Sequence, residues 1–99
     1  MRVLDDCHCY ILSTFMDGER DLTFYEMRED GKKFDGVTNE EVLKVLIHRI
    51  RYLNETWQDG KFKCRENSIA ITKLEEALMW LERRTTNRIE RGVEGTHKE

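Results

Sequence analysis

Four arginines lie close together near the C-terminal end of the chain, at positions 83, 84, 88 and 91. Arg84 and Arg88 are four residues apart, so they are neighbours on one face if this segment is helical. Two guanidinium groups in that arrangement could hold a phosphate or a pyrophosphate bidentately. Cations near a helix C-terminus also stabilise the helix dipole without binding any ligand. The position of these arginines alone leaves both interpretations open.

Two aromatic residues, Trp57 and Phe62, flank the turn that Asp59 and Gly60 predict. Aromatic rings at the mouth of a loop between helices could stack a purine ring. Trp57 also continues the apolar stripe of the preceding segment, so packing in the core is the alternative role for this side chain.

The sequence holds no set of residues that indicates catalysis or metal binding. Cys7, His8 and Cys9 resemble a metal-binding fragment, but on a strand the two thiols would face one way and the imidazole the other. His48 lies among charged neighbours, and no nucleophile with a base or pair of carboxylates stands out. We therefore expect no metal, no cofactor and no enzymatic activity.

Two long helices must position the arginines and the aromatic residues. Thr38 and Glu41 have the spacing of a capping box, which predicts a helix of roughly 18 residues beginning there. Its apolar stripe consists of Leu43, Leu46, Ile50, Leu53 and Trp57. A second helix is expected to begin within residues 64–68 and to end at Gly92, with Ile71, Leu74, Leu78 and Leu81 on its stripe. The two would form an antiparallel helix hairpin over residues 38–92.

The first 37 residues predict a small antiparallel β-sheet. Residues 9–15 and 21–27 are rich in β-branched and aromatic side chains and are separated by a turn, and a short third extended segment follows at 33–35. We therefore expect an α+β protein made of a β-sheet part (1–37), a helix hairpin (38–92) and a non-periodic tail (93–99).

Size and composition favour one oligomeric domain. The chain has 99 residues, of which 38% are hydrophobic and 37% charged, so a monomer would have a thin core and self-association would help to stabilise it. The net charge of −3 argues against binding of polymeric nucleic acid. No apolar run approaches the roughly 20 residues that cross a bilayer, and no signal peptide is evident. We expect a soluble cytoplasmic protein that does not bind membranes.

Several longer strings resemble a known family. They are residues 34–41 (FDGVTNEE), 48–50 (HRI), 64–80 (CRENSIAITKLEEALMW) and 88–96 (RIERGVEGT). Over residues 34–97 the sequence resembles the phage Thoeris anti-defence sponges, the first-described family of that type. The helix hairpin is shared with the anti-CBASS sponges, which sequester cyclic oligonucleotides. The N-terminal sheet and the tail favour the Thoeris sponges.

The resemblance implies a binding function without catalysis. Such a protein would sequester the intact glycocyclic ADP-ribose signal of the Thoeris system in the host bacterial cytoplasm. Carried over by position, the ligand-binding residues are Trp57, with Phe62 as its substitute, and Asn67, Arg84 and Arg88. Several members also bind cyclic di- or trinucleotides at a separate site. The assembly would be a dimer or a hexamer built as a trimer of dimers, and in the hexamer we place such a site between the dimers, at the tail residues Arg91, Thr96 and His97.

Helix geometry adds a constraint on this ligand site. Asn67 and Arg84 are 17 residues apart, which is roughly 25 Å along a helix. If long second helices pack antiparallel in a dimer, the start of one meets the arginine end of the other and two equivalent pockets form. Two alternatives stay open, namely a sponge for cyclic oligonucleotides only and a protein-interaction module that binds no nucleotide.

Overall fold

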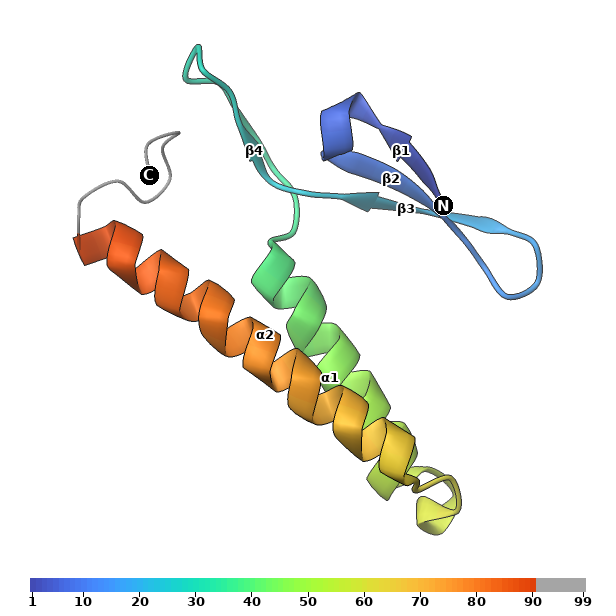
Figure 1. The fold of residues 1–99 in the computed structure, drawn as a ribbon. Helices are drawn as coiled ribbons and strands as arrows, with labels where there is room; N and C mark the ends of the chain where they lie inside the picture. Colours follow the sequence, from blue (N-terminus) through green and yellow to red (C-terminus); the bar gives the residue numbers. More distant parts are fainter. Residues whose placement is uncertain (91–99) are drawn as a thin grey trace. The chain divides into compact units, whose positions relative to one another are not determined.

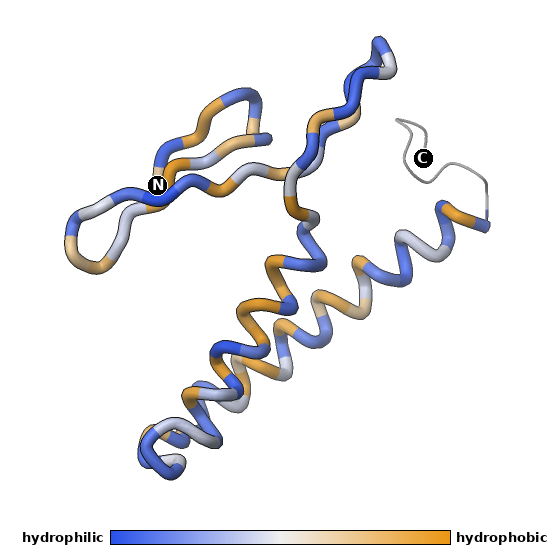
Figure 2. The backbone as a smooth tube through the Cα atoms, turned by 180° about the vertical axis from the view of Figure 1, so that it is seen from behind, coloured by the Kyte–Doolittle hydropathy of each residue, from blue (hydrophilic) through white to orange (hydrophobic). Residues whose placement is uncertain are grey.

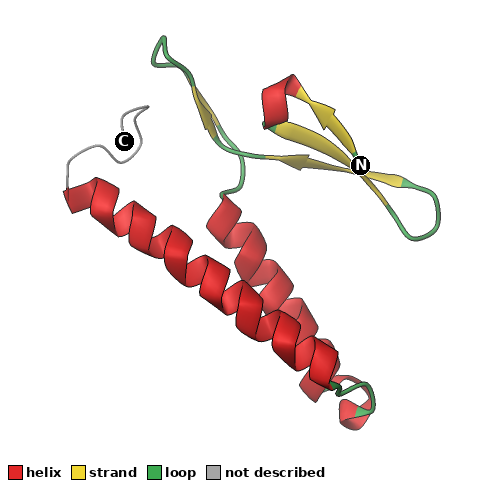
Figure 3. Ribbon diagram, in the orientation of Figure 1, coloured by secondary structure: helices red, strands yellow, loops and turns green. Residues whose placement is uncertain are grey.

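The computed structural model describes residues 1–90, which form two compact units. Residues 1–38 form the first unit, and the described residues from Asn39 onward form the second (Figure 1). In chain order the elements are β1 (Arg2–Leu4), the short 3-10 helix η1 (Asp5–Cys7), β2 (Cys9–Ser13), β3 (Glu19–Thr23), β4 (Glu26–Met27), β5 (Lys33–Phe34), α1 (Asn39–Glu55), the 3-10 turn η2 (Trp57–Gly60) and α2 (Arg65–Glu90). The predicted α+β class, with a small antiparallel sheet before a helix hairpin, is confirmed (Figure 3).

The sheet of the first unit has three antiparallel strands in the order β1, β2, β3. Tyr10 on the central strand pairs with Val3 on one side and Leu22 on the other. The predicted hairpin corresponds to β2 and β3, and its turn is closed by a hydrogen bond of 2.7 Å that the Gly18 amide donates to Thr14 Oγ1. Strand β1 was not predicted, because three residues at an edge carry too little pattern to reveal a strand.

The predicted strand 21–27 is interrupted at Phe24 and Tyr25. Here the backbone turns to a new partner, and the Tyr25 amide donates a hydrogen bond of 2.9 Å to the Val37 carbonyl. Gly36 permits this approach, because a Cβ at that position would lie 2.4 Å from the Phe24 carbonyl carbon. Residues after the interruption form a separate two-stranded ribbon of β4 and β5.

The second unit is an antiparallel pair of helices with a narrow buried seam. Ile47 and Ile71 are its buried apolar residues, with 7% and 6% exposure, and Asn54 lies between the helices with 2% exposure. The predicted stripe was partly wrong, because Leu46 is 42% exposed and Ile47 occupies the seam instead. A stripe counted from apolar residues alone overlooked Asn54, the polar member of the seam. Hydrophobic residues nevertheless recur along both helices, as Figure 2 shows.

Asn54 fixes the connection between the two helices. Its Oδ1 accepts a hydrogen bond of 2.9 Å from the Cys64 amide, and its Nδ2 donates one of 3.3 Å to Ser68 Oγ. Ser68 in turn donates to the Cys64 carbonyl at 3.2 Å. Helix α2 begins at Arg65, within the predicted range, and Asn67 and Ser68 both lie in its first turn.

Helix α2 is much longer than its neighbour. It has 26 residues in the described part of the chain against 17 in α1, so it is about 39 Å long. The expected end at Gly92 lies outside the described residues. In residues 1–90, neither helix is both long and apolar enough to span a membrane.

Candidate functional site

The loop between the helices brings the two predicted aromatic residues together. The rings of Trp57 and Phe62 are stacked, with centroids 5.3 Å apart and planes inclined by 21°. Gln58 and Asp59 both have positive φ angles, 50° and 57°, so the backbone reverses tightly between the rings. Trp57 lies beyond the end of α1 and is 40% exposed, which argues against the core-packing role. Each ring covers one face of the other and both remain accessible at the surface.

Asn67 lies at the same end of the helix pair. It is half-buried in the first turn of α2, and its Nδ2 donates a hydrogen bond of 3.4 Å to the Phe62 carbonyl. The structure therefore brings three of the five predicted ligand residues together, namely Trp57, Phe62 and Asn67. An aromatic stack beside an amide can bind a heterocyclic base through its face and its edge.

Arg84 and Arg88 lie towards the other end of α2. Arg84 is exposed and Arg88 is half-buried, and they are one helical turn apart. Along the helix axis Arg84 lies roughly 25 Å from Asn67 by the rise of 1.5 Å per residue. A single chain therefore does not bring the five predicted ligand residues together, because the arginines lie far along α2 from Asn67.

The other residues singled out from the sequence are placed as follows. Arg91, Thr96 and His97 lie outside the described residues. The strand geometry expected for the cysteine fragment was wrong, because Cys7 belongs to η1 and has a φ of 71°, and only Cys9 lies in a strand. Both cysteines are free thiols, and residues 1–90 contain no cluster of three or more side chains placed to hold a metal ion.

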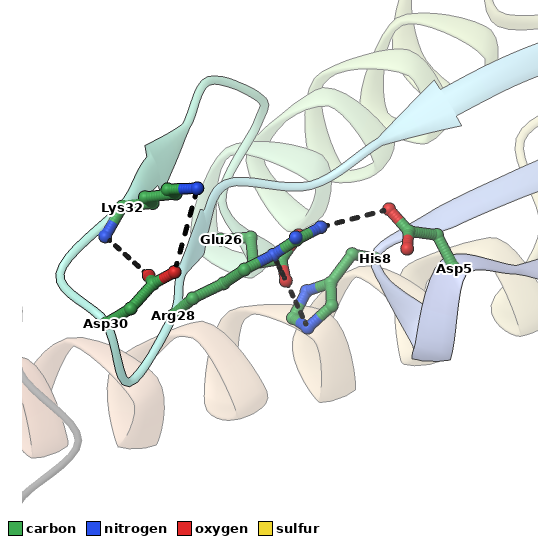
Figure 4. Close-up of polar contacts among 6 residues, drawn as sticks. All are labelled: Asp5, His8, Glu26, Arg28, Asp30 and Lys32. Carbon is green, nitrogen blue, oxygen red and sulfur yellow. Dashed lines mark hydrogen bonds and ion pairs between the residues drawn. The ribbon is translucent and has the colours of Figure 1, made fainter.

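A charged cluster in the first unit was not predicted (Figure 4). Arg28 Nε donates a hydrogen bond of 2.8 Å to Glu26 Oε2, and its guanidinium lies 4.2 Å from the centroid of the Phe34 ring. His8 Nε2 approaches the same Glu26 oxygen at 3.8 Å, and Asp5 lies 4.0 Å from Arg28. The hydrogen bond from Arg28 lowers the pKa of Glu26 despite the partial burial of the carboxylate. Glu26 lies in β4 and Arg28 directly follows the end of that strand, two residues on, a spacing that places both side chains on one face of an extended chain.

Helices α1 and α2 also enclose a groove of about 650 Å³. Ile47 and Leu78 are among the residues that line it, together with side chains of both charges that include Arg51 and Glu75. Arg51 and Glu75 form an ion pair of 3.0 Å across the helices. His48 lines the groove and is exposed. None of the five predicted ligand residues lines this groove.

Comparison with known proteins identifies a family and a named relative. Residues 22–86 match the family described as the Acb2/Tad1 hairpin domain, a range that includes α1, η2 and most of α2 and ends before Arg88. A protein named Thoeris anti-defense 1, from Bacillus phage SBSphiJ7, is 55% identical over 64 residues. These residues make up 65% of this chain but 42% of the relative, so the chain covers less than half of that protein. The expected resemblance is confirmed, and the chain belongs to the Acb2/Tad1 hairpin domain family.

Proposed function

We propose that this protein is a phage anti-defence sponge that binds the glycocyclic ADP-ribose signal of the Thoeris system in the host cytoplasm. The observation that carries the proposal is the family match together with a relative whose name contains Thoeris anti-defense. The helix hairpin, with an aromatic stack at one end and arginines towards the other, supports the same function.

In this proposal the loop end and the arginines are two half-sites, whose chemistry suits the parts of this ligand. A purine base can stack on Trp57, and Asn67 can hydrogen-bond a base edge or a ribose hydroxyl. Arg84 and Arg88 can neutralise a pyrophosphate with bidentate hydrogen bonds. Within the described residues Arg84 forms no ion pair with a carboxylate, so its guanidinium is available to an anion.

The proposed site is completed by a second copy of the chain. Antiparallel packing of two α2 helices would place the loop end of one copy beside the arginine end of the other. Two-fold symmetry would then give two equivalent pockets per dimer. Assembly of three such dimers into a hexamer is part of the same proposal.

Sequestration requires tight binding but no bond cleavage. To compete with the receptor for a scarce signal, a sponge needs nanomolar affinity, which corresponds to about 12 kcal/mol. A pocket built on rigid helices loses little entropy on binding, so this affinity is attainable from a modest number of contacts. We therefore infer that the ligand is held unchanged and that the protein is not an enzyme.

Two other functions are each favoured by one observation. The family description covers the helix hairpin of both Acb2 and Tad1, which favours a sponge for cyclic oligonucleotides as the first alternative. Phe15 and Met16 at the β2–β3 turn are 103% and 88% exposed, which favours a protein-interaction module as the second.

Native mass spectrometry with and without glycocyclic ADP-ribose tests the proposal. We expect two ligands per dimer, and chromatography of the heat-denatured complex should recover them unaltered. Recovery of a cleaved ligand would indicate an enzyme instead. Uptake of cyclic di- or trinucleotides alone would favour the first alternative, and uptake of no nucleotide would favour the interaction module.

A further inference from the structure

The arginine end of α2 carries an aromatic residue that the proposed site does not use. Trp80 is 54% exposed, although tryptophan is a large apolar side chain that usually packs inside a protein or at an interface. The guanidinium carbon of Arg83 lies over its ring, 5.4 Å from the centroid. One face of the indole is therefore covered by a cation, and much of the remaining ring surface is accessible.

Helix geometry groups Trp80 with two cations. Arg83 and Arg84 follow it by three and four residues, the spacings at which side chains are neighbours on a helix surface. Arg2, Arg28 and Arg51 each pair with a carboxylate. In the described part of the chain neither Arg83 nor Arg84 does so. Two guanidinium groups without a carboxylate partner therefore flank an exposed indole.

We propose that Trp80 is a base-stacking residue of the nucleotide site, with Arg83 and Arg84 contacting the phosphates of the same ligand. This inference rests on the proposed function and deepens it. An indole face binds a base by stacking, and guanidinium forks bind phosphate oxygens, so the group recognises both parts of a nucleotide. The separation suits such a ligand, because Trp80 and Arg84 are about 6 Å apart along the helix axis by its rise per residue.

A stacking role for Trp80 would place an aromatic ring close to the arginines, which the loop residues of the same chain do not do. Arg84 lies roughly 25 Å along α2 from Asn67, the helix residue at the loop end, and one face of the Trp57 ring is already occupied by Phe62. With Trp80 as a stacking residue, one protomer can contact the base and the phosphates at once. The loop end of a second copy then closes the pocket instead of supplying its only aromatic surface.

Tryptophan fluorescence tests this role directly, because Trp57 and Trp80 are the two tryptophans of the chain. In the Trp57→Phe variant of the 99-residue chain, Trp80 is the sole tryptophan, and we expect glycocyclic ADP-ribose to quench its emission. Inorganic pyrophosphate should leave the emission nearly unchanged, since it can contact the arginines but cannot stack. The Trp80→Phe variant reports the response of Trp57 separately.

Calorimetry supplies the second measurement. We expect Trp80→Ala to weaken ligand binding about tenfold, equivalent to about 1.4 kcal/mol, and Trp80→Phe to restore most of the loss. Met79→Ala is the matched control, because Met79 is 51% exposed and adjacent but points about 100° away around the helix. This control should bind the ligand with the affinity of the unsubstituted protein.

Each outcome separates this inference from the proposed function. If Arg84→Ala abolishes binding while Trp80→Ala binds normally and Trp80 emission does not respond, the sponge survives and the role of Trp80 is refuted. If Trp80→Ala only changes the oligomer in native mass spectrometry and Trp80 emission ignores the ligand, the indole is an interface residue and the inference is again wrong. If the unsubstituted protein takes up no ligand, both proposals fail together.

Discussion

Replacement of Asn54 by alanine should destabilise the helix hairpin by about 2–3 kcal/mol. The substitution removes the hydrogen bonds to the Cys64 amide and to Ser68 Oγ, each contributing about 1 kcal/mol, and leaves a small cavity at a site that is 2% exposed. Alanine regains about 0.5 kcal/mol through its higher helix propensity. Cys64 is an exposed residue, so water can replace part of the hydrogen bond that its amide loses. The loss of stability should therefore lie near the lower end of the range of about 2–3 kcal/mol.

Urea unfolding at a fixed protein concentration measures this effect, since the concentration then keeps any contribution of self-association constant. Ser68→Ala is the matched variant, because it breaks the bond to Asn54 from the other side, and we expect it to cost about 1 kcal/mol or less. The double variant should cost less than the sum of the two single variants, because both substitutions remove the contact between Asn54 and Ser68. Strictly additive costs, or an Asn54→Ala protein as stable as the original, would refute the reasoning.

Three further results are expected. Arg84→Ala and Arg88→Ala should each weaken binding of glycocyclic ADP-ribose at least tenfold in calorimetry without changing the helix content by circular dichroism, and unchanged affinity in both would move the phosphate site elsewhere. Gly36→Ala should unfold the first unit, because the new Cβ would lie 2.4 Å from the Phe24 carbonyl carbon, and faster amide exchange of β3 and β4 would show it. Gly31→Ala is the control. It has open space around it and a φ of 85°, so it should cost only about 1 kcal/mol of stability. Glu26 has a folded-state pKa below its ordinary value of 4.5, so its stabilising effect is complete above that pH and disappears as the pH falls through the lowered pKa. The stability difference between Glu26→Gln and the original protein should therefore shrink on acidification below pH 4.5, and a difference that grows there would contradict this sign.

The helix hairpin could be predicted because its apolar residues recur with the period of a helix over long segments. The seam of α1 was harder to assign, since Asn54 is buried by hydrogen bonds that only the folded loop provides. The interruption at Phe24 depends on a hydrogen bond between Tyr25 and Val37, twelve residues apart in the sequence, so no local pattern could reveal it. Long-range pairing of this kind is decided by tertiary contacts and not by propensity.

The candidate site shows the same division between local and distant causes. The placement of Arg84 and Arg88 on one face of a helix could be predicted from their spacing of four residues. The structure adds that Arg84 is exposed and Arg88 is half-buried. The stack of Trp57 on Phe62 depends instead on positive φ angles at Gln58 and Asp59, a conformation that residues other than glycine adopt at a cost. Both aromatic residues can be identified from the sequence. Their contact depends on the turn between them, which is held by the hydrogen bond from the Cys64 amide to Asn54 Oδ1.

The length of α2 links ligand binding to assembly in the proposed function. Because α2 keeps Asn67 and Arg84 roughly 25 Å apart, a ligand that contacts both half-sites must bridge two chains. A ligand that binds only the assembled pocket stabilises the dimer by an amount that grows with the ligand concentration relative to its Kd, so the dimer must dissociate less readily when the ligand is present. If Trp80, Arg83 and Arg84 hold most of the ligand within one protomer, the coupling between ligand binding and dimerisation is weaker. The coupling that remains comes from the contacts that the second copy supplies. The dependence of dimer dissociation on ligand concentration therefore measures how the binding energy is divided between the two ends of α2.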